Sequence, residues 1–109
     1  MIPRGIIPRG TTPTIRYRFR TVNATDIVVA YMTMKQGALV VEKTLADATA
    51  VHDEANNYLE WTLTQAETLS FSMKIDIEIQ CRWRTGEGVA GESPITITDP
   101  ARILKEGEI

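Results

Sequence analysis

The sequence predicts an all-β protein built as a sandwich of two antiparallel sheets. Apolar and polar residues alternate strictly in several segments, turn-forming residues recur about every 8 to 12 positions, and almost no segment has the helical period of about 3.6. The segment from Lys74 to Arg84 alternates most clearly, with isoleucine, cysteine and tryptophan on one face and charged or amide residues on the other. At roughly 35 Å this strand is longer than usual, so we expect a bulge near its end.

The chain begins with a short repeat, and we expect a flexible arm over residues 1–13. The tetrapeptide Ile-Pro-Arg-Gly occurs at residues 2–5 and again at residues 7–10. Proline lacks a backbone N–H and glycine loosens the chain, so this segment is not expected to form a regular strand by itself. A duplicated start or a cloning remnant explains the repeat as easily as a function does.

The predicted sandwich covers residues 14–99, and residues 100–109 form a polar tail. Its first half contains an alternating strand and then a strand that is apolar on both sides, which indicates either burial of both faces or a bulge. Gln36 and Gly37 form a tight turn that joins the second strand to a third as a hairpin. These three strands are Thr14–Arg20, Ile27–Lys35 and Ala38–Lys43.

The middle of the chain predicts two further strands and one helical turn. The strands are Thr49–Asp53, whose pattern is weak, and Tyr58–Leu63, whose pattern is strictly alternating. Thr64 and Glu67 have the spacing of a capping box, which places a helical turn over Gln65–Leu69.

The last strand is predicted over Val89–Thr98, with Ile95 and Ile97 pointing inward, Pro94 marking an edge position or a bulge, and an Asp-Pro pair at its end. About seven short strands with regular turns are typical of an immunoglobulin-like β-sandwich, and a small closed barrel is the alternative. Trp61 and Trp83 fall on the apolar phase of their strands, so we expect both in the core.

The charge is unevenly distributed along the chain. The net charge is -2, but five arginines precede the first acidic residue, Asp26, so the start is basic and the remainder is acidic. This polarity favours docking onto an acidic surface or contacts between copies of the chain. Arginines that keep a solvated edge strand from stray pairing are the alternative explanation. With no long apolar run and a single cysteine, we expect a protein made in the cytoplasm that has no membrane partner.

No group of residues completes a catalytic, cofactor or metal site, so we expect neither enzyme activity nor a cofactor. A stable metal site generally needs three or four ligands, and beside His52, Asp53 and Glu54 there is no second histidine and Cys81 is distant, so the ligand set is incomplete. The serines have no nucleophile motif around them. Cys81 falls on the apolar face of its strand, which indicates a core residue.

Single-stranded nucleic acid is the one other partner with suitable residues. Arg16, Arg18 and Arg20 would meet phosphates, and Tyr17 or Phe19 would stack on bases. In an alternating strand, however, the aromatic side chains lie on the opposite face from the arginines, and the acidic remainder of the chain repels phosphate. Nucleic acid is therefore the less favoured partner.

Three segments of the chain resemble small prophage proteins of Firmicutes. They are I-P-R-G-T-T-P-T at the start, L-T-Q-A-E-T-L-S-F with I-E-I-Q-C-R-W-R in the middle, and I-T-I-T-D-P-A-R-I-L-K-E-G at the end. They are also similar to the immunoglobulin-like N-terminal domain of phage baseplate upper proteins. The resemblance implies a non-enzymatic tail or baseplate protein that docks on other phage structural proteins or on copies of itself, within the virion when the prophage is active.

We expect the basic start of the chain to make these docking contacts. In this interpretation an extended arm lies on another subunit, its isoleucines fill an apolar groove and its arginines meet carboxylates. The candidate docking residues are Arg4, Ile6, Ile7, Arg9, Arg16, Arg18 and Arg20.

A saccharide- or peptide-binding adhesion module is the alternative function. Sandwich domains present such sites in their end loops, which are here predicted at Thr21–Asp26, Asp53–Tyr58 and Thr85–Val89. The candidate ligand contacts are Asn23, Asn57, Tyr58 and Glu87, with Tyr58 as the expected aromatic contact.

Overall fold

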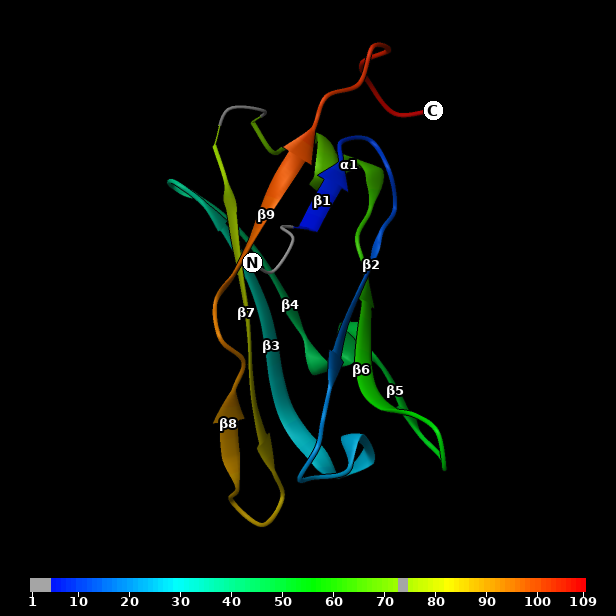
Figure 1. Cartoon of the computed structure of the whole chain (residues 1–109), viewed down its shortest axis with the longest axis vertical. Coiled ribbons are helices and arrows are strands. Elements are labelled where there is room, and N and C mark those ends of the chain that lie inside the picture. The colour runs from blue at the N-terminus through cyan, green and yellow to red at the C-terminus, as the bar shows by residue number, and fades with distance from the viewer. Residues whose placement is uncertain (1–4, 73–74) are drawn as a thin grey trace.

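The computed structural model describes residues 5–72 and 75–109, which form two facing β-sheets and one short helix (Figure 1). The larger sheet has the strand order β1-β9-β7-β3-β4, with β8 also paired to β7, and the smaller sheet has the order β2-β6-β5. The elements are β1 (Gly5–Pro8), β2 (Thr14–Arg18), the 3-10 turn Ala24–Asp26, β3 (Ile27–Gln36), β4 (Leu39–Thr44), the 3-10 turn Leu45–Asp47, β5 (Thr49–His52), β6 (Asn57–Thr62), α1 (Gln65–Leu69), β7 (Ile77–Thr85), β8 (Ala90–Glu92) and β9 (Thr96–Ala101).

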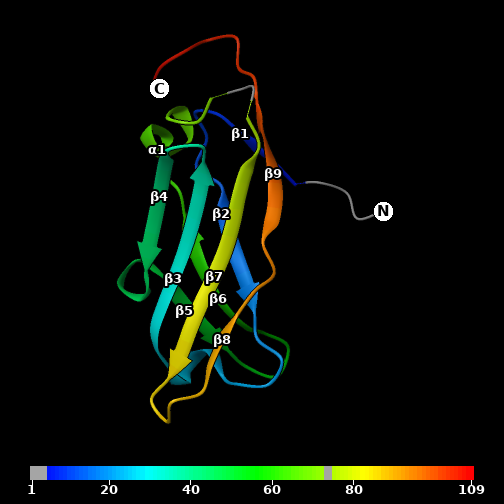
Figure 2. The ribbon, with the colours of Figure 1, turned by 90° about the vertical axis from the view of Figure 1, so that its left-hand side faces the viewer.

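The predicted all-β, immunoglobulin-like sandwich is confirmed. Strands β5, β6 and β2 lie in the order of strands D, E and B of an immunoglobulin domain, and β9, β7, β3 and β4 lie in the order of G, F, C and C′ of the variable type. The strand pairs in the described residues are antiparallel except for β1 with β9, which is parallel. Figure 2 looks onto the larger sheet, with β7 between β3 and β9.

Strand β7 occupies the middle of the larger sheet, as its strong alternation predicted. Its inward residues Ile77, Ile79 and Cys81 are buried, and the charged residues between them face solvent. The prediction is wrong for Ile75, which was expected to point inward but precedes the strand and is 49% exposed. A bulge lies at the end of the β3–β7 pairing, but its additional residue, Val28, belongs to β3 and not to the long strand: Ile27 faces Thr85 and Val29 faces Arg84. The bulge explains why β3 is apolar on both sides, because the extra residue shifts the phase of the strand.

The predicted helical turn and its capping box are confirmed in α1. Thr64 Oγ1 accepts a hydrogen bond from Glu67 N at 3.1 Å, and the Glu67 carboxylate accepts one from Thr64 N at 2.8 Å. Lys43 Nζ lies 2.8 Å from the same carboxylate. Burial raises the pKa of Glu67, but the hydrogen bonds from Lys43 and Thr64 outweigh it and leave that pKa below its ordinary value. The weak pattern before Asn57 also forms the predicted strand, β5.

The expectation of a flexible arm is wrong for Gly5–Pro8, which form strand β1 of the folded domain. Ile7 faces Pro100 across the β1–β9 pair and is only 3% exposed. The contact with β9 continues beyond β1, where Arg9 N donates a hydrogen bond to Ala101 O at 3.2 Å. A proline is tolerated here because β1 is an edge strand, where a missing N–H need not break a ladder.

The predicted last strand is wrong in its extent and in its phase. The structure divides it into β8 and β9, and β9 continues through the Asp-Pro pair to Ala101. The buried positions of β9 are Thr98 and Pro100, whereas Ile95 and Ile97 are exposed. The chain leaves the strand around Pro94. The alternation of inward and outward side chains therefore begins anew in β9, with a different phase. Lys74, the predicted start of the long strand, lies outside the described residues.

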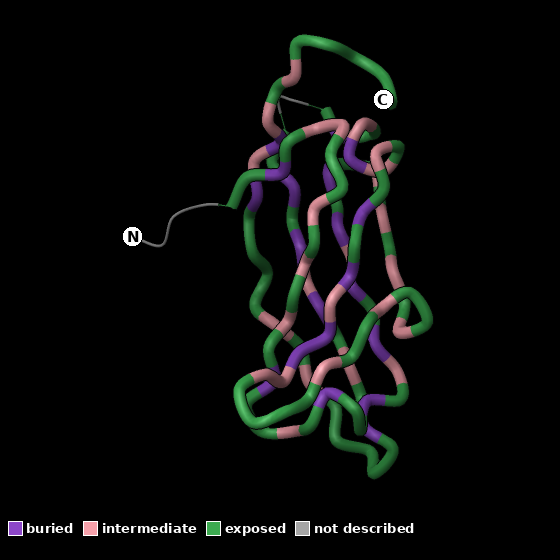
Figure 3. Tube along the Cα trace, turned by 90° about the vertical axis from the view of Figure 1, so that its right-hand side faces the viewer, coloured by how far each residue is buried: buried purple, intermediate pink, exposed green. Residues whose placement is uncertain are grey.

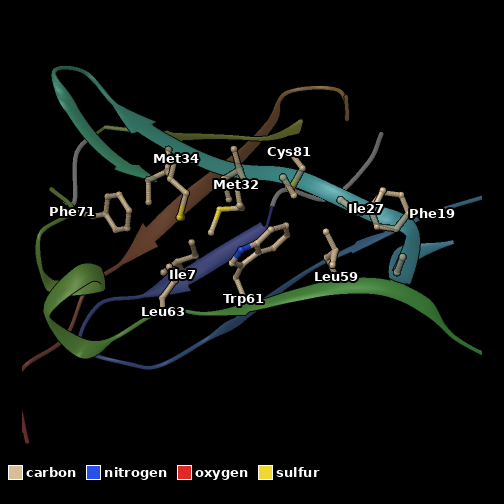
Figure 4. Close-up of a cluster of buried hydrophobic side chains, with 14 residues drawn as sticks. Ile7, Phe19, Ile27, Met32, Met34, Leu59, Trp61, Leu63, Phe71 and Cys81 are labelled. Atoms are coloured by element: carbon tan, nitrogen blue, oxygen red, sulfur yellow. The ribbon is translucent and has the colours of Figure 1, made fainter. Parts of the chain in front are cut away.

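The core fills the space between the two sheets, and buried residues alternate with exposed ones along the strands (Figure 3). Trp61 lies inside as predicted, and its Nε1 donates a hydrogen bond to Thr44 O at 2.9 Å. Trp83 is only partly buried, with its ring centroid 5.2 Å from that of Phe19 at the edge of the core. The largest fully buried side chains include Trp61, Phe71, Met32, Met34, Leu59 and Leu63 (Figure 4).

Candidate partner-binding surfaces

The outward side of the larger sheet carries exposed apolar side chains. We call this surface the outer sheet face and define it by the outward residues of β3, β4, β7, β8 and β9 together with Ile95 in the connection between β8 and β9 (Figure 2). Tyr31, Val40, Ile95 and Ile97 are 43%, 49%, 54% and 38% exposed. In the smaller sheet, whose three strands are described in full, no large hydrophobic residue is exposed to this degree. Of the two described sheets, the larger one therefore presents the large exposed apolar side chains.

Charged side chains lie between these apolar groups. Lys35 faces Glu78 and Tyr31 faces Arg82 in the register of β3 with β7. Arg82 Nε lies 3.5 Å from the carboxylate of Glu92, and both side chains are mostly exposed. An exposed pair of this kind contributes at most about 1 kcal/mol, so a partner with its own charges can rearrange it at little cost.

Two shallow hollows follow β7 on the outer sheet face. The larger, of about 520 Å³, is lined by the side chains of Tyr31, Arg82 and Arg84 together with residues of β8. The smaller, of about 370 Å³, lies beside it along the strand and is lined by residues that include Glu78 and Ile95. The larger hollow combines an aromatic ring with arginine and glutamate side chains. The smaller hollow combines the apolar Ile95 with Lys35 and Glu78. Such mixtures of apolar and charged groups are common in protein interfaces.

The N-terminal docking candidates are drawn into the chain's own domain. Ile7 is part of the hydrophobic core, and Arg9 Nη1 donates a hydrogen bond to the carboxylate of Glu106 at 2.8 Å. This corrects the expected contact of Ile7 and Arg9 with another subunit, because in this arrangement their own domain already satisfies both. Ile6 remains exposed, and Arg4 lies outside the described residues.

The remaining docking candidates, Arg16, Arg18 and Arg20, lie away from the outer sheet face. Arg16 and Arg18 project from the smaller sheet, and Arg20 is exposed just beyond it. A 2.7 Å hydrogen bond to the Glu60 carboxylate, together with its charge, raises the pKa of Arg16. The guanidinium groups of Arg16 and Arg18 lie 4.6 and 5.9 Å from the centre of the Tyr58 ring. This surface therefore presents arginines with a covered ring, which is unlike a base-stacking platform.

Two of the three predicted end loops converge on one hollow. Asn23, in the loop after β2, and Glu87, in the turn after β7, both line a hollow of about 470 Å³. Asp26 and Thr85 lie in the same wall, so hydroxyl, amide and carboxylate groups predominate. The lining contains no aromatic side chain on which a sugar ring would stack.

Asn57 and Tyr58 do not belong to this hollow, although the sequence predicted them as ligand contacts. Asn57 Oδ1 accepts a hydrogen bond from Ala24 N at 2.7 Å, and its Nδ2 donates to the carbonyls of Phe19 and Val22 at 3.1 and 2.8 Å. Its amide is therefore used to hold the connection between β2 and β3. Tyr58 is buried within β6, so the expectation that it contacts a ligand from a loop is wrong.

The reactive side chains are dispersed. Within residues 5–72 and 75–109, no three His, Cys, Asp or Glu side chains gather as they would around a metal ion. His52 Nδ1 lies 3.1 Å from Asn57 Oδ1. Burial raises the pKa of the Cys81 thiol to about 11, so the thiol stays protonated well above neutral pH. In the same ranges no helix has the length and apolar character needed to cross a membrane.

The outer sheet face was missed by the sequence prediction for two reasons. Strand β3 was apolar on both sides, which hid the outward position of Tyr31, and Ile95 and Ile97 were assigned to the core. The signal that could have revealed the face is Pro94, because a proline inside a strand indicates an interruption after which the phase must be read again.

Comparison with known proteins adds a likeness of fold. No protein-family model matches the chain, and no curated protein matches it. Among solved structures, the chain is similar to the immunoglobulin-like domain of mouse leukocyte-associated immunoglobulin-like receptor 1, which was crystallised as a strand-swapped dimer. The TM-score is 0.46 and the sequence identity is 11%, with 89% of this chain and 86% of that chain covered.

Proposed function

We propose that this chain is a non-enzymatic assembly domain of a phage or prophage particle, a tail or baseplate protein that docks on a neighbouring structural protein through the outer sheet face. The partner is another phage structural protein or a second copy of the chain. The observation that carries the docking surface is the concentration of exposed apolar side chains, Tyr31, Val40, Ile95 and Ile97, on that face. The sequence resemblance to Firmicutes prophage proteins supports the proposal that the chain belongs to a phage or prophage particle.

The outer sheet face is large enough for a stable interface. One partner in a standard protein interface contributes about 800 Å² of surface. The molecule measures 46 × 29 × 26 Å, so the sheet that runs along its long axis offers a face of that order. Interfaces of this kind combine apolar contacts with polar ones, and the interspersed apolar and charged groups described above supply both.

The docking surface is tested by a charge-neutral double variant, Tyr31→Glu/Ile97→Lys. The new glutamate faces Arg82 and the new lysine faces Glu78, so both fit the register and the sandwich should keep its melting temperature within a few degrees. Because the apolar contacts are lost, we expect the amount of this chain in purified particles to fall at least tenfold.

The matched control is Thr49→Lys/Thr62→Glu on the smaller sheet. Both threonines are exposed, and Thr49 faces Glu60 while Thr62 faces Thr14. This variant should be incorporated as well as the wild type. Equal incorporation of the two double variants would exclude the outer sheet face as the docking surface.

A second candidate function is the binding of a small polar ligand at the end of the sandwich. The convergence of Asn23 and Glu87 on one polar hollow favours it. A saccharide and peptide screen with the wild type and with Asn23→Ala/Glu87→Ala tests this function. A ligand that binds the wild type and is lost in the variant supports it, whereas a ligand retained by the variant, or none at all, counts against it.

A further inference from the structure

Residues 7–10, which continue from the end of strand β1, lie in a groove of the domain, and Ile7, Arg9 and Gly10 each make specific contacts there. We call it the β1 groove and define it by β9, the end of α1 and the C-terminal tail at Glu106. Its apolar part takes Ile7, which lies between the two sheets near Leu63 and Trp61 (Figure 4). Replacing a side chain buried to this extent by a polar one would leave a cavity and an unsatisfied group.

The polar part of the groove fixes Arg9. Its Nη1 donates to Glu106 Oε1 at 2.8 Å, its Nη2 donates to Leu69 O at 3.1 Å, and its backbone N donates to Ala101 O at 3.2 Å. The Arg9 side chain is largely buried by these contacts. The carboxylate and the two carbonyls define a site for an arginine in an extended segment.

The next position requires glycine. Gly10 has φ 77°, and a Cβ built on it would lie 3.3 Å from Ile103 Cδ1 and 3.5 Å from Leu69 Cδ2. Both the left-handed backbone and the close packing disfavour any other residue. The groove therefore favours isoleucine at position 7, arginine at position 9 and glycine at position 10. At position 8 it accepts a residue, such as proline, that donates no backbone hydrogen bond.

The chain contains this tetrapeptide twice, at residues 2–5 and at residues 7–10. The first copy provides the same isoleucine, arginine and glycine at the same spacing, although residues 2–4 lie outside the described part of the chain. Gly5 has no positive φ as part of β1, but a glycine adopts the left-handed backbone of Gly10 without strain.

The spacing between the copies provides reach. If the second copy leaves the groove, residues 6–13 connect the first copy to β2, and eight extended residues span about 26 to 29 Å. The shortest dimension of the molecule is 26 Å. The first copy can therefore reach the β1 groove of an adjacent molecule while β2 stays in its own sandwich.

We infer that the β1 groove is a binding site for the sequence Ile-Pro-Arg-Gly and that it takes Ile2–Gly5 of a second copy of the chain in place of its own residues 7–10. The exchange replaces the contacts of residues 7–10 by equivalent ones, so its main free-energy costs are those of bringing two molecules together and of releasing the pairs of Gly5 and Ile6 with β9. A high local concentration of copies, as in an assembly, offsets this cost. The inference depends on neither the outer sheet face nor the nature of the particle.

The test uses three variants of the full chain, studied by light scattering and thermal unfolding over a range of concentrations. Ile7→Ser/Arg9→Ser disables the second copy of the tetrapeptide, Ile2→Ser/Arg4→Ser disables the first, and a combined variant carries all four changes. We expect the first of these to form dimers or larger oligomers as its concentration rises. The Ile2→Ser/Arg4→Ser variant should remain monomeric with the melting temperature of the wild type.

The combined variant should be monomeric and have the lowest melting temperature, because no tetrapeptide can fill its groove. Two results would overturn the inference. A monomeric Ile7→Ser/Arg9→Ser variant that melts with the wild type would mean that its own first copy fills the groove. An Ile7→Ser/Arg9→Ser variant with the melting temperature of the combined variant would mean that the first copy does not bind at all.

A second measurement does not depend on the folding of these variants. A labelled peptide with the sequence of residues 1–6, M-I-P-R-G-I, is titrated into the wild-type chain, and the control peptide carries Ile2→Ser and Arg4→Ser. We expect saturable binding of the first peptide and at least tenfold weaker binding of the control. Equal binding of both peptides, or binding of neither, would contradict the assigned site.

Discussion

Gly91 is the residue at which the packing of the core edge is most sensitive. A Cβ added there would lie 2.3 Å from Trp83 Cζ2, whereas a Cβ added at Gly86 would have Val28 Cγ1 as its neighbour at 3.6 Å. Neither glycine has a positive φ, so steric overlap alone separates the two. The indole ring covers Gly91 in the β7–β8 pair and is too rigid to move aside cheaply.

We therefore predict that Gly91→Ala lowers the free energy of unfolding by about 1 to 3 kcal/mol. Gly86→Ala, the matched control, should change it by less than about 0.5 kcal/mol. Urea unfolding followed by tryptophan fluorescence measures both. Similar losses in the two variants would show that the contact with Trp83 is not the cause.

The buried thiol of Cys81 makes stability depend on alkaline pH. Burial raises the pKa of this thiol to about 11 from its ordinary value of 9.0. As the pH rises from about 9 to about 11, the unfolded chain loses the thiol proton while the folded chain keeps it. The free energy of unfolding therefore falls in this window, by at most about 1.4 kcal/mol per pH unit.

The prediction is tested by comparing the wild type with Cys81→Ala, which has no thiol to ionise. Below about pH 9 the difference in their free energies of unfolding should be constant, and above it the wild type should lose stability more steeply. Other groups that titrate at high pH act on both proteins and cancel in the difference. Parallel curves up to pH 11 would contradict the assigned burial of the thiol.

Among the elements, those specified by local sequence were predicted well. The alternation of β7 and the capping box of α1 need only neighbouring residues, and both are present as predicted. Strand β1 was not predicted, because its pairing with β9 joins segments about 90 residues apart and overrides the one glycine and one proline within it. Strand β9 was placed in the wrong phase for a similar reason.

The phase of β9 depends on a contact that periodicity does not reveal. Ser93 N donates a hydrogen bond to Cys81 O at 2.9 Å, and Ser93 Oγ accepts one from Cys81 N at 2.9 Å. These bonds hold the chain at the break between β8 and β9, so that Thr98 rather than Ile97 turns inward. An apolar residue in an interrupted strand is therefore poor evidence for the core.

The candidate site residues were also predicted in part from the sequence. Asn23 and Glu87 share a hollow because the loops at one end of a sandwich converge, which the fold alone implies. Tyr58 was misassigned because arginines of β2 cover its ring, about 40 residues away in sequence. Burial by a distant strand cannot be inferred from local patterns.

The start of α1 permits a prediction for a whole element. The Thr64 side chain caps the helix, and the helix leads into Phe71, which is fully buried beneath it. Thr64→Ala should lower the free energy of unfolding by about 1 kcal/mol because the N3 amide loses its acceptor. Thr64→Ser keeps the hydroxyl and should have little effect. Thermal unfolding of both variants measures this, and equal losses would show that the hydroxyl does not act as a cap.

At the scale of the whole molecule, the two sides of the sandwich differ in character. The smaller sheet presents arginine and glutamate, paired at 2.7 Å in Arg16 and Glu60, whereas the larger sheet presents exposed apolar groups among dispersed charges. A domain with exposed apolar groups on one side and paired charges on the other suits assembly in a fixed orientation. This asymmetry is the physical basis of the proposed role as a structural part of a particle.

The most direct measurement of that role is quantitative mass spectrometry of particles purified on a density gradient from a bacterial culture that carries the prophage. A structural part must be present in a fixed number of copies per particle. We predict that the ratio of this chain to the major tail proteins is the same in every fraction that contains intact particles. Absence of the chain from those fractions, or a ratio that changes from one fraction to the next, would contradict the proposed role.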